Sequence, residues 1–121
     1  MKKQQLVKSF VQYFEIRNGD IYSRITIEFK KLEEGFLGFC FPDRNGIVIQ
    51  INKSLNEAEM ISTLFHELVH AKQFDSGILQ WNSDNGDFHW RGELTKLPYS
   101  KQPWEKQAYR LQDKMVAELQ H

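Results

Sequence analysis

Apolar residues recur along this 121-residue chain with two different periods. Residues 3–16 carry them at helical spacing, which predicts an amphipathic N-terminal helix. Residues 21–29 and 47–51 alternate between apolar and polar positions, as half-buried strands do. Residues 36–41 are apolar almost throughout, which predicts a more buried strand between them. Because the connections are short and rich in turn residues, we expect the three strands to form an antiparallel meander.

A second helical pattern begins after the third strand. Ser54 is the expected N-cap, with Glu57 as its capping-box partner three residues later. The helix should run to about Phe74, with Gly77 at the position of a C-terminal cap. Its apolar stripe comprises Ile61, Leu64, Phe65, Leu68 and Ala71. The other face is polar and comprises Thr63, His66, Glu67, His70 and Gln73.

The remainder of the chain divides into an irregular segment and a helix. Residues 78–102 lack periodicity and are rich in Asn, Asp, Gly and Trp, which predicts a long loop. Pro103 suits the first turn of a final helix. The buried stripe of that helix would comprise Trp104, Ala108, Leu111, Met115 and Leu119. We therefore expect a single α+β domain over residues 1–121, with an N-terminal helix, a three-stranded mainly antiparallel sheet, a central helix, a long loop and a C-terminal helix.

The central helix contains the run His66-Glu67-Leu68-Val69-His70. Residues four apart lie on one face of a helix, so His66 and His70 point the same way and can bind one metal ion. Glu67 lies beside them, where it can polarise a metal-bound water. Since the helix has its own apolar stripe, its histidines are not needed for packing. We therefore prefer a metal site to the alternative, an ordinary amphipathic helix whose charged face has this order by chance.

A catalytic zinc usually has three protein ligands and one water. One class of zinc peptidase has a glycine and then a histidine at the places that Gln73 and Ser76 occupy here, so that class is excluded. Two candidates for the third ligand remain. Glu105 begins the last helix and would face the site if the two helices pack together, although the helix dipole also favours a first-turn Glu. His89 lies in the irregular segment, where a lone histidine is more often a surface or packing residue.

Composition narrows the remaining functions. Sixteen basic residues balance sixteen acidic ones, which gives no support for nucleic-acid binding driven by bulk charge. The single cysteine, Cys40, lies in an apolar run and is expected to be a small buried hydrophobe, in a chain from a reducing compartment. No stretch has the length of a membrane span or the pattern of a signal peptide, so we expect a cytoplasmic protein that does not contact membranes. The oligomeric state stays open.

Three blocks of sequence resemble the small zincin-like metallopeptidase domains found in bacteriophage genomes. They are residues 66–73, residues 90–92, and Tyr99 with residues 103–105 and 107–109. The last block typically reads P-W-E-x-E-A, and this resemblance implies that Glu105 is the third metal ligand, as in gluzincins. The chain departs from the block at Gln107, where a second Glu is usual. Gln107 faces about 200° away from Glu105 on a helix, so the two are not interchangeable. The chain is also distantly similar to SprT-like proteases, but it has no histidine at the place of their downstream histidine ligand.

The resemblance implies a zinc-dependent metallopeptidase, in a bacterial or phage-infected cell, that cleaves a peptide or protein substrate. Its expected Zn²⁺ ligands are His66, His70 and Glu105. Glu67 would act as general base towards the metal-bound water, and Tyr99 or His89 would donate to the developing oxyanion. In zincin-type hydrolases the sheet precedes this helix, and its edge strand can hold an extended peptide. The alternative function is a non-catalytic, zinc-stabilised module that binds another protein on the same scaffold.

Overall fold

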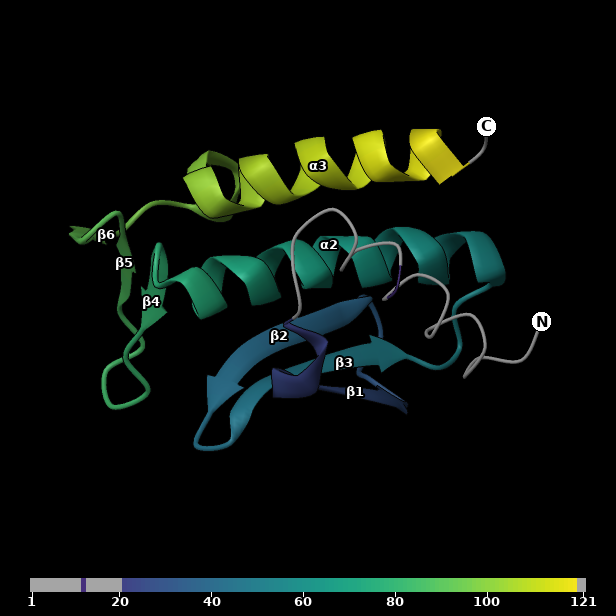
Figure 1. Cartoon of the computed structure of the whole chain (residues 1–121), viewed down its shortest axis with the longest axis horizontal. Helices are drawn as coiled ribbons and strands as arrows, with labels where there is room; N and C mark the ends of the chain where they lie inside the picture. The colour runs from purple at the N-terminus through teal and green to yellow at the C-terminus, as the bar shows by residue number, and fades with distance from the viewer. Residues whose placement is uncertain (1–11, 13–20, 120–121) are drawn as a thin grey trace.

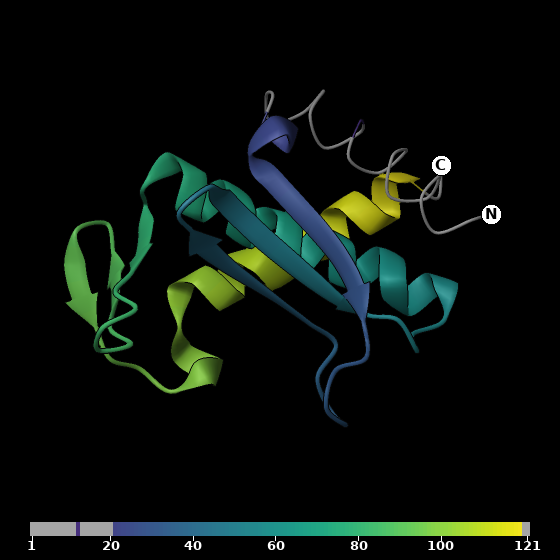
Figure 2. The ribbon, with the colours of Figure 1, turned by 90° about the horizontal axis from the view of Figure 1, so that it is seen from below.

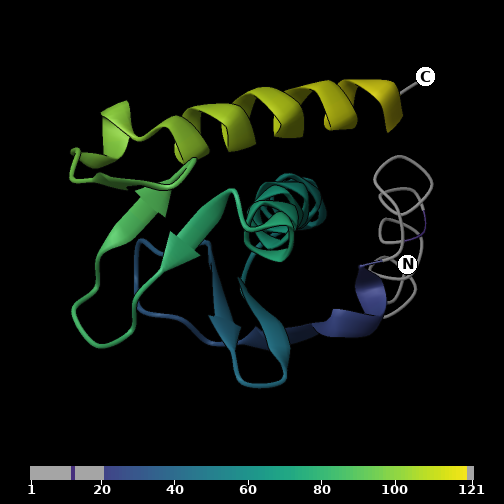
Figure 3. The ribbon, with the colours of Figure 1, turned by 60° about the vertical axis from the view of Figure 1, so that its left-hand side comes forward.

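The computed structural model describes residue 12 and residues 21–119, so all but one residue of the helix expected at 3–16 lie outside the described residues. The elements are η1 (Tyr22–Arg24), β1 (Ile25–Lys30), β2 (Gly38–Asp43), β3 (Gly46–Asn52), α2 (Glu57–Ser76), β4 (Leu79–Trp81), β5 (Phe88–Trp90), β6 (Glu93–Thr95), η2 (Tyr99–Lys101) and α3 (Pro103–Leu119). The first sheet, α2 and α3 form three successive layers (Figure 1), and Figure 3 shows α2 nearly end-on between the other two. The predicted α+β class is confirmed.

The first sheet has the strand order β1-β3-β2, and Figure 2 shows β3 between the other two strands. β2 and β3 form the expected antiparallel hairpin. β1 instead pairs with β3 in parallel, with Ile25 opposite Ile47, so the expected meander is wrong. The central strand β3 is also the most buried of the three, and its Ile49 and Ile51 are fully buried. Pro42 has no N–H to donate and is tolerated on the edge strand β2.

The apolar run at 36–41 is less buried than its composition predicted. Phe36, Leu37 and Phe39 are 46%, 53% and 39% exposed. The expectation of a buried strand is wrong because β2 is an edge strand, whose one strand neighbour within the described part of the chain is β3. The rings of Phe36 and Phe39 pack together with their centroids 5.1 Å apart. These three side chains form an apolar rim at the edge of the sheet.

α2 is buried on both of its faces. The predicted apolar stripe packs on the sheet, where Leu64, Phe65, Leu68 and Ala71 are fully buried. Burying each of the large side chains contributes about 1.5–3 kcal/mol. The polar face is buried as well, with Thr63, Glu67, His70 and Gln73 each less than a tenth exposed. Buried polar groups need partners, so this face of α2 is where a functional site is expected.

The N-cap of α2 is Asn56 and not Ser54. Asn56 accepts a hydrogen bond from the N–H of Glu59, whose side chain accepts one from the N–H of Asn56. Ser54 is engaged elsewhere, because its hydroxyl and its N–H both donate to Oδ1 of Asn52 at 2.8 and 3.1 Å. The helix therefore starts two residues later than predicted. It ends at Gly77 with a φ of +82°, the left-handed cap that the sequence predicted.

Residues 78–102 are not the loop that their composition predicted. β4, β5 and β6 form a second, antiparallel sheet, which lies beside the end of α2 and the start of α3 (Figure 1). Phe88 stacks on Trp104 with the ring centroids 5.1 Å apart, and Trp90 lies 6.2 Å from the same ring. α3 begins at Pro103 as predicted, and the buried Trp104 anchors its first turn. Neither α2 nor α3, the two long helices of the described part of the chain, is both long and apolar enough to cross a membrane.

Candidate active site

The polar face of α2 borders a cavity of about 730 Å³. Its lining includes residues of α2, of β2 with the loop before it, and of the first turns of α3. Donor atoms of His66, Glu67 and His70 lie within 4.8 Å of one another, as the spacing along the helix predicted. The apolar stripe on the opposite side of α2 fixes the direction of these three side chains, because it is packed against the sheet.

α3 brings Glu105 to the same point. Oε1 of Glu105 lies 2.9 Å from Nε2 of His66 and 3.0 Å from Nε2 of His70. The two histidine nitrogens are 3.2 Å apart. All three side chains are mostly buried, with exposures of 11%, 8% and 14% for His66, His70 and Glu105. One carboxylate oxygen and two imidazole nitrogens therefore form a nearly regular triangle.

This triangle has the dimensions of one face of a tetrahedral zinc site. Ligand atoms about 2.0–2.1 Å from the metal would be roughly 3.3 Å apart. The contacts of the two Nδ1 atoms agree with metal binding through Nε2. Nδ1 of His66 lies 2.9 Å from Oε1 of Gln112, and Nδ1 of His70 lies 2.8 Å from Oε1 of Gln73. An amide oxygen only accepts, so each of these contacts requires a proton on Nδ1. The Nε2 atoms then face Glu105, to which a protonated imidazole donates a hydrogen bond and beside which a neutral imidazole can bind a metal. The donor set fits a cation such as Zn²⁺.

The charges around the triangle favour a negative carboxylate that faces positive charge. Burial disfavours the charged form of Glu105, but hydrogen bonds from His66 and His70 outweigh it and lower the pKa of Glu105 to about 2. Burial also disfavours charged His70, yet the bond to Glu105 and the charges of Glu105 and Glu67 raise the pKa of His70 overall. A cation between these groups would satisfy the same electrostatic preference.

Glu67 is 5% exposed and lies between α2 and the edge strand β2. Burial raises the pKa of Glu67 to about 7, although the nearby His70 and His66 lower it. A Cβ at Gly38 would come within 2.8 Å of the carbonyl oxygen of Gln50 and 3.3 Å of Oε2 of Glu67. Gly38 therefore permits the close approach of β2 to this carboxyl. A carboxyl with a pKa near neutrality can both accept and return a proton.

Two tyrosines lie beside Glu105. The hydroxyl of Tyr99 donates to Oε1 of Glu105 at 3.2 Å and lies 2.9 Å from the hydroxyl of Tyr109. The ring of Tyr109 packs on the ring of His66 with the centroids 4.4 Å apart. Burial and the bond to Tyr109 raise the pKa of Tyr99, so its hydroxyl keeps its proton. The other predicted donor, His89, lies on β5 in the second sheet and does not line the cavity.

Sequence reasoning missed the roles of three residues around the two histidines. Gln73 was recognised only as part of a polar face, and Tyr109 and Gln112 were not singled out as site residues. Helical spacing could have identified them. Gln73 follows His70 by three residues, and Tyr109 and Gln112 follow Glu105 by four and seven, so each shares a helix face with a predicted ligand. Once Glu105 is placed at the site, the same face of α3 brings the other two residues there.

Cys40 lines the cavity from β2. Its side chain is partly buried and packs against the apolar core. Burial, and then the charge of Glu67, raises the pKa of the Cys40 thiol well above its usual range. Because the thiolate is the form that binds metals, a protonated thiol here acts as the small apolar residue that the sequence predicted.

Comparison with known proteins agrees with this combination of sheet and helix. Residues 23–96 match the model of the IrrE N-terminal-like domain, a zincin-like family of the metallopeptidase type. The matched segment contains both sheets and the whole of α2, and it ends before Glu105. Neither the curated proteins nor the solved structures contain a match. The resemblance to zincin-like metallopeptidases is thereby confirmed, and the chain belongs to the IrrE N-terminal-like domain family.

Proposed function

We propose that this protein is a zinc-dependent peptidase in which His66, His70 and Glu105 bind the metal and Glu67 is the general base. The observation that carries the proposal is the convergence of Oε1 of Glu105 and two Nε2 atoms at 2.9, 3.0 and 3.2 Å. Two imidazoles and one carboxylate suit zinc and leave its fourth position for water. Membership of a metallopeptidase-type family supports the same reaction class.

A zinc ion bound by these residues would lower the pKa of its water towards roughly 7 and polarise the substrate carbonyl. Glu67 accepts a proton from the attacking water and returns it to the leaving amine. Burial supports both steps, because it raises the pKa of Glu67 to about 7. Gly38 lets β2 lie directly against this carboxyl, which limits the positions that the side chain can adopt.

Tyr99 is the proposed donor to the oxyanion that develops during attack. Its hydroxyl lies at the ligand cluster, 3.2 Å from Oε1 of Glu105, and is held there by the hydroxyl of Tyr109 at 2.9 Å. The raised pKa of Tyr99 keeps the proton that such a donor needs. One donor of this kind is worth on the order of 100-fold in rate.

The edge strand β2 is the proposed binding surface for an extended peptide. β2 borders the cavity and, among the residues that the structure describes, pairs with β3 alone. A peptide can add to such an edge through main-chain hydrogen bonds. The apolar rim of Phe36, Leu37 and Phe39 would then contact the peptide's side chains. We therefore propose peptide or protein substrates with an apolar residue near the cleaved bond.

The decisive experiment compares the zinc-loaded wild type with Glu67→Gln on a diverse peptide library read by mass spectrometry. Gln has the shape of Glu but cannot accept the proton, so the variant should keep about one zinc per chain and lose cleavage by at least about 100-fold. Glu57→Gln, on the exposed first turn of α2, is the matched control and should cleave like the wild type. Equal cleavage by Glu67→Gln would refute the mechanism.

The exposed apolar rim also suits the alternative function, a zinc-stabilised module that binds another protein. The same experiment separates the two functions. A wild type that takes up zinc and becomes more stable, but cleaves nothing in the library, would favour the binding module. Cleavage that depends on Glu67 would favour the peptidase.

A further inference from the structure

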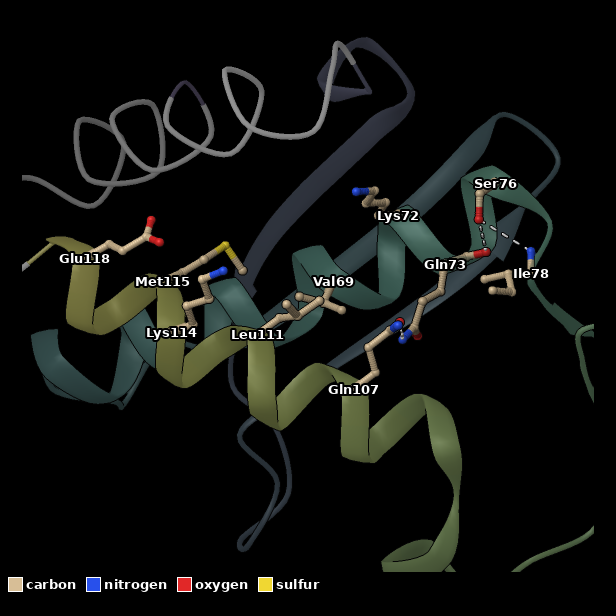
Figure 4. A pocket seen from close by; sticks show the side chains of 10 residues that line it. All are labelled: Val69, Lys72, Gln73, Ser76, Ile78, Gln107, Leu111, Lys114, Met115 and Glu118. Atoms are coloured by element: carbon tan, nitrogen blue, oxygen red, sulfur yellow. Dashed lines mark hydrogen bonds between the residues drawn. The ribbon is translucent and has the colours of Figure 1, made fainter.

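Gln73 connects the first turn of α3 with the outer side of His70. Oε1 of Gln73 lies 2.8 Å from Nδ1 of His70. Its Nε2 donates to the main-chain carbonyl of Trp104 at 3.1 Å and to Oε1 of Gln107 at 2.8 Å. Gln73 is 3% exposed, so protein groups and not solvent supply these partners. Figure 4 shows the amide groups of Gln73 and Gln107 meeting between α2 and α3.

The main-chain carbonyl of Trp104 determines which way the amide group of Gln73 is turned. A main-chain carbonyl only accepts hydrogen bonds, so the NH₂ group of Gln73 must face Trp104. The oxygen of the same amide is then left for His70, and it requires a proton on Nδ1. With Nδ1 protonated, Nε2 of His70 is the nitrogen that faces Glu105 and can bind a metal. The histidine tautomer therefore follows from how α3 packs on α2.

The other histidine has a different partner. Nδ1 of His66 lies 2.9 Å from Oε1 of Gln112, a half-buried residue that lines the open cavity. Gln73 is instead 3% exposed, lies between α2 and α3 and does not line that cavity. The two glutamines thus provide a matched pair for experiment, because each hydrogen-bonds a different one of the two site histidines.

We propose that Gln73 and Gln107 are positioning residues that hold His70 in the tautomer that binds metal, and that they do so only when α3 is docked. Because Trp104 directly precedes Glu105, a single turn of α3 both presents Glu105 and orients His70 through Gln73. Gln107 lies away from Glu105, as its helical offset predicted, and needs only to accept from Gln73. Gln in place of the usual Glu therefore preserves this contact. The inference rests on the zinc site proposed above.

The test measures zinc affinity by chelator competition and the His70 Nδ1–H by ¹⁵N–¹H NMR, with and without zinc. Gln73→Met keeps the volume of the side chain but removes the acceptor. It should weaken zinc binding by about 10- to 100-fold, the usual effect of losing an outer partner of a metal-binding histidine. The slowly exchanging His70 Nδ1–H should disappear as well. In Gln112→Met the signal of His66 should be lost and that of His70 should remain.

Variants at position 107 keep the test decisive if Gln73→Met does not fold. Gln107→Leu removes one acceptor from Gln73 and should weaken zinc binding by about 3- to 10-fold, in the range of one hydrogen bond. Gln107→Glu keeps an acceptor and should bind zinc within about twofold of the wild type, since a carboxylate can take the same bond.

The NMR signal also separates this inference from the proposed function. A wild type without zinc affinity would end the peptidase proposal, whereas the metal-free His70 Nδ1–H would still test the contact with Gln73. An unprotonated Nδ1 in wild-type His70, or unchanged zinc affinity and an unchanged signal in Gln73→Met or Gln107→Leu, would overturn the inference.

Discussion

The two halves of the candidate site are held in place by different forces. The α2 half carries His66, Glu67 and His70 on a helix whose opposite face packs against the sheet. The α3 half carries Glu105, whose carboxylate is held by hydrogen bonds to the two histidines and to Tyr99. The family match covers the first half and ends before the second. The histidine pair is therefore a local property of one helix, whereas completion of the site depends on helix docking.

The largest expected effect comes from removing the α3 contribution. Glu105→Ala should leave the α2 half folded but weaken zinc binding by more than about 100-fold, beyond the usual effect of an outer partner. Elemental mass spectrometry and chelator competition measure this change. Lys106→Ala, at the next position of α3 and exposed, is the control and should bind zinc like the wild type. A Glu105→Ala protein with wild-type affinity would mean that another residue is the third ligand.

A smaller effect is expected where the sheet meets the α2 half. In Gly38→Ala the new Cβ would lie 2.8 Å from the carbonyl oxygen of Gln50 and 2.9 Å from Cγ2 of Thr63. Overpacking of this kind should lower the free energy of unfolding by about 1–3 kcal/mol, as urea denaturation would measure. Cleavage should fall more than zinc affinity does, because the new Cβ would also lie 3.3 Å from Oε2 of Glu67, the proposed general base.

A double variant sharpens this prediction. Thr63→Ser removes the methyl group that the new Cβ would meet, so Gly38→Ala/Thr63→Ser should regain part of the stability that Gly38→Ala loses. If the two substitutions are simply additive, the close packing of β2 on α2 does not limit this position.

The smallest effect is expected at the exposed end of α2. Asp75 accepts from Nε and Nη2 of Arg24 at 2.7 and 2.9 Å, with the two side chains 25% and 48% exposed. Asp75→Asn should cost only about 0.2–1 kcal/mol and leave zinc binding unchanged. A larger loss would show that this pair between η1 and α2 contributes more to stability than exposed ion pairs usually do.

The same pair has a defined pH dependence. The hydrogen bond from Arg24 lowers the pKa of Asp75, so the folded state binds this proton less readily than the unfolded state. The contribution is therefore complete above the unfolded pKa of about 3.9 and is lost as the pH falls through the lower folded value. The difference in stability between the wild type and Asp75→Asn should accordingly be present at neutral pH and shrink in acid.

Predictions from the sequence succeeded where one stretch of chain contains its own signal. The period of α2 predicted both its apolar stripe and the convergence of His66 with His70. Gly77 and Pro103 marked helix ends through their backbone preferences alone. The predicted N-cap, Ser54, was wrong. Ser and Asn both suit an N-cap, and the hydrogen bonds of Ser54 to Asn52 leave the position to Asn56.

Predictions failed where the outcome depends on distant neighbours. The alternation in 21–29 indicates a strand but not its partner, so the parallel pairing of β1 with β3 was missed. An apolar run such as 36–41 suits a central strand equally well, and only the strand order leaves it at an edge. The three-residue strands of the second sheet are too short for a period to emerge, although Phe88 and Trp90 pack on Trp104.

The sequence by itself determined the two long helices and the strands of the first sheet, together with one half of the candidate site, because helical and strand periods are local and the two histidines share one helix. Tertiary structure alone decided which residue meets them. Glu105 and His89 were both open from the residues, and the docking of α3 places Glu105 2.9 and 3.0 Å from the two histidine nitrogens. Glu105 follows His66 by 39 residues and His70 by 35. A contact over such a separation depends on how the whole core packs, so no local sequence pattern predicts it.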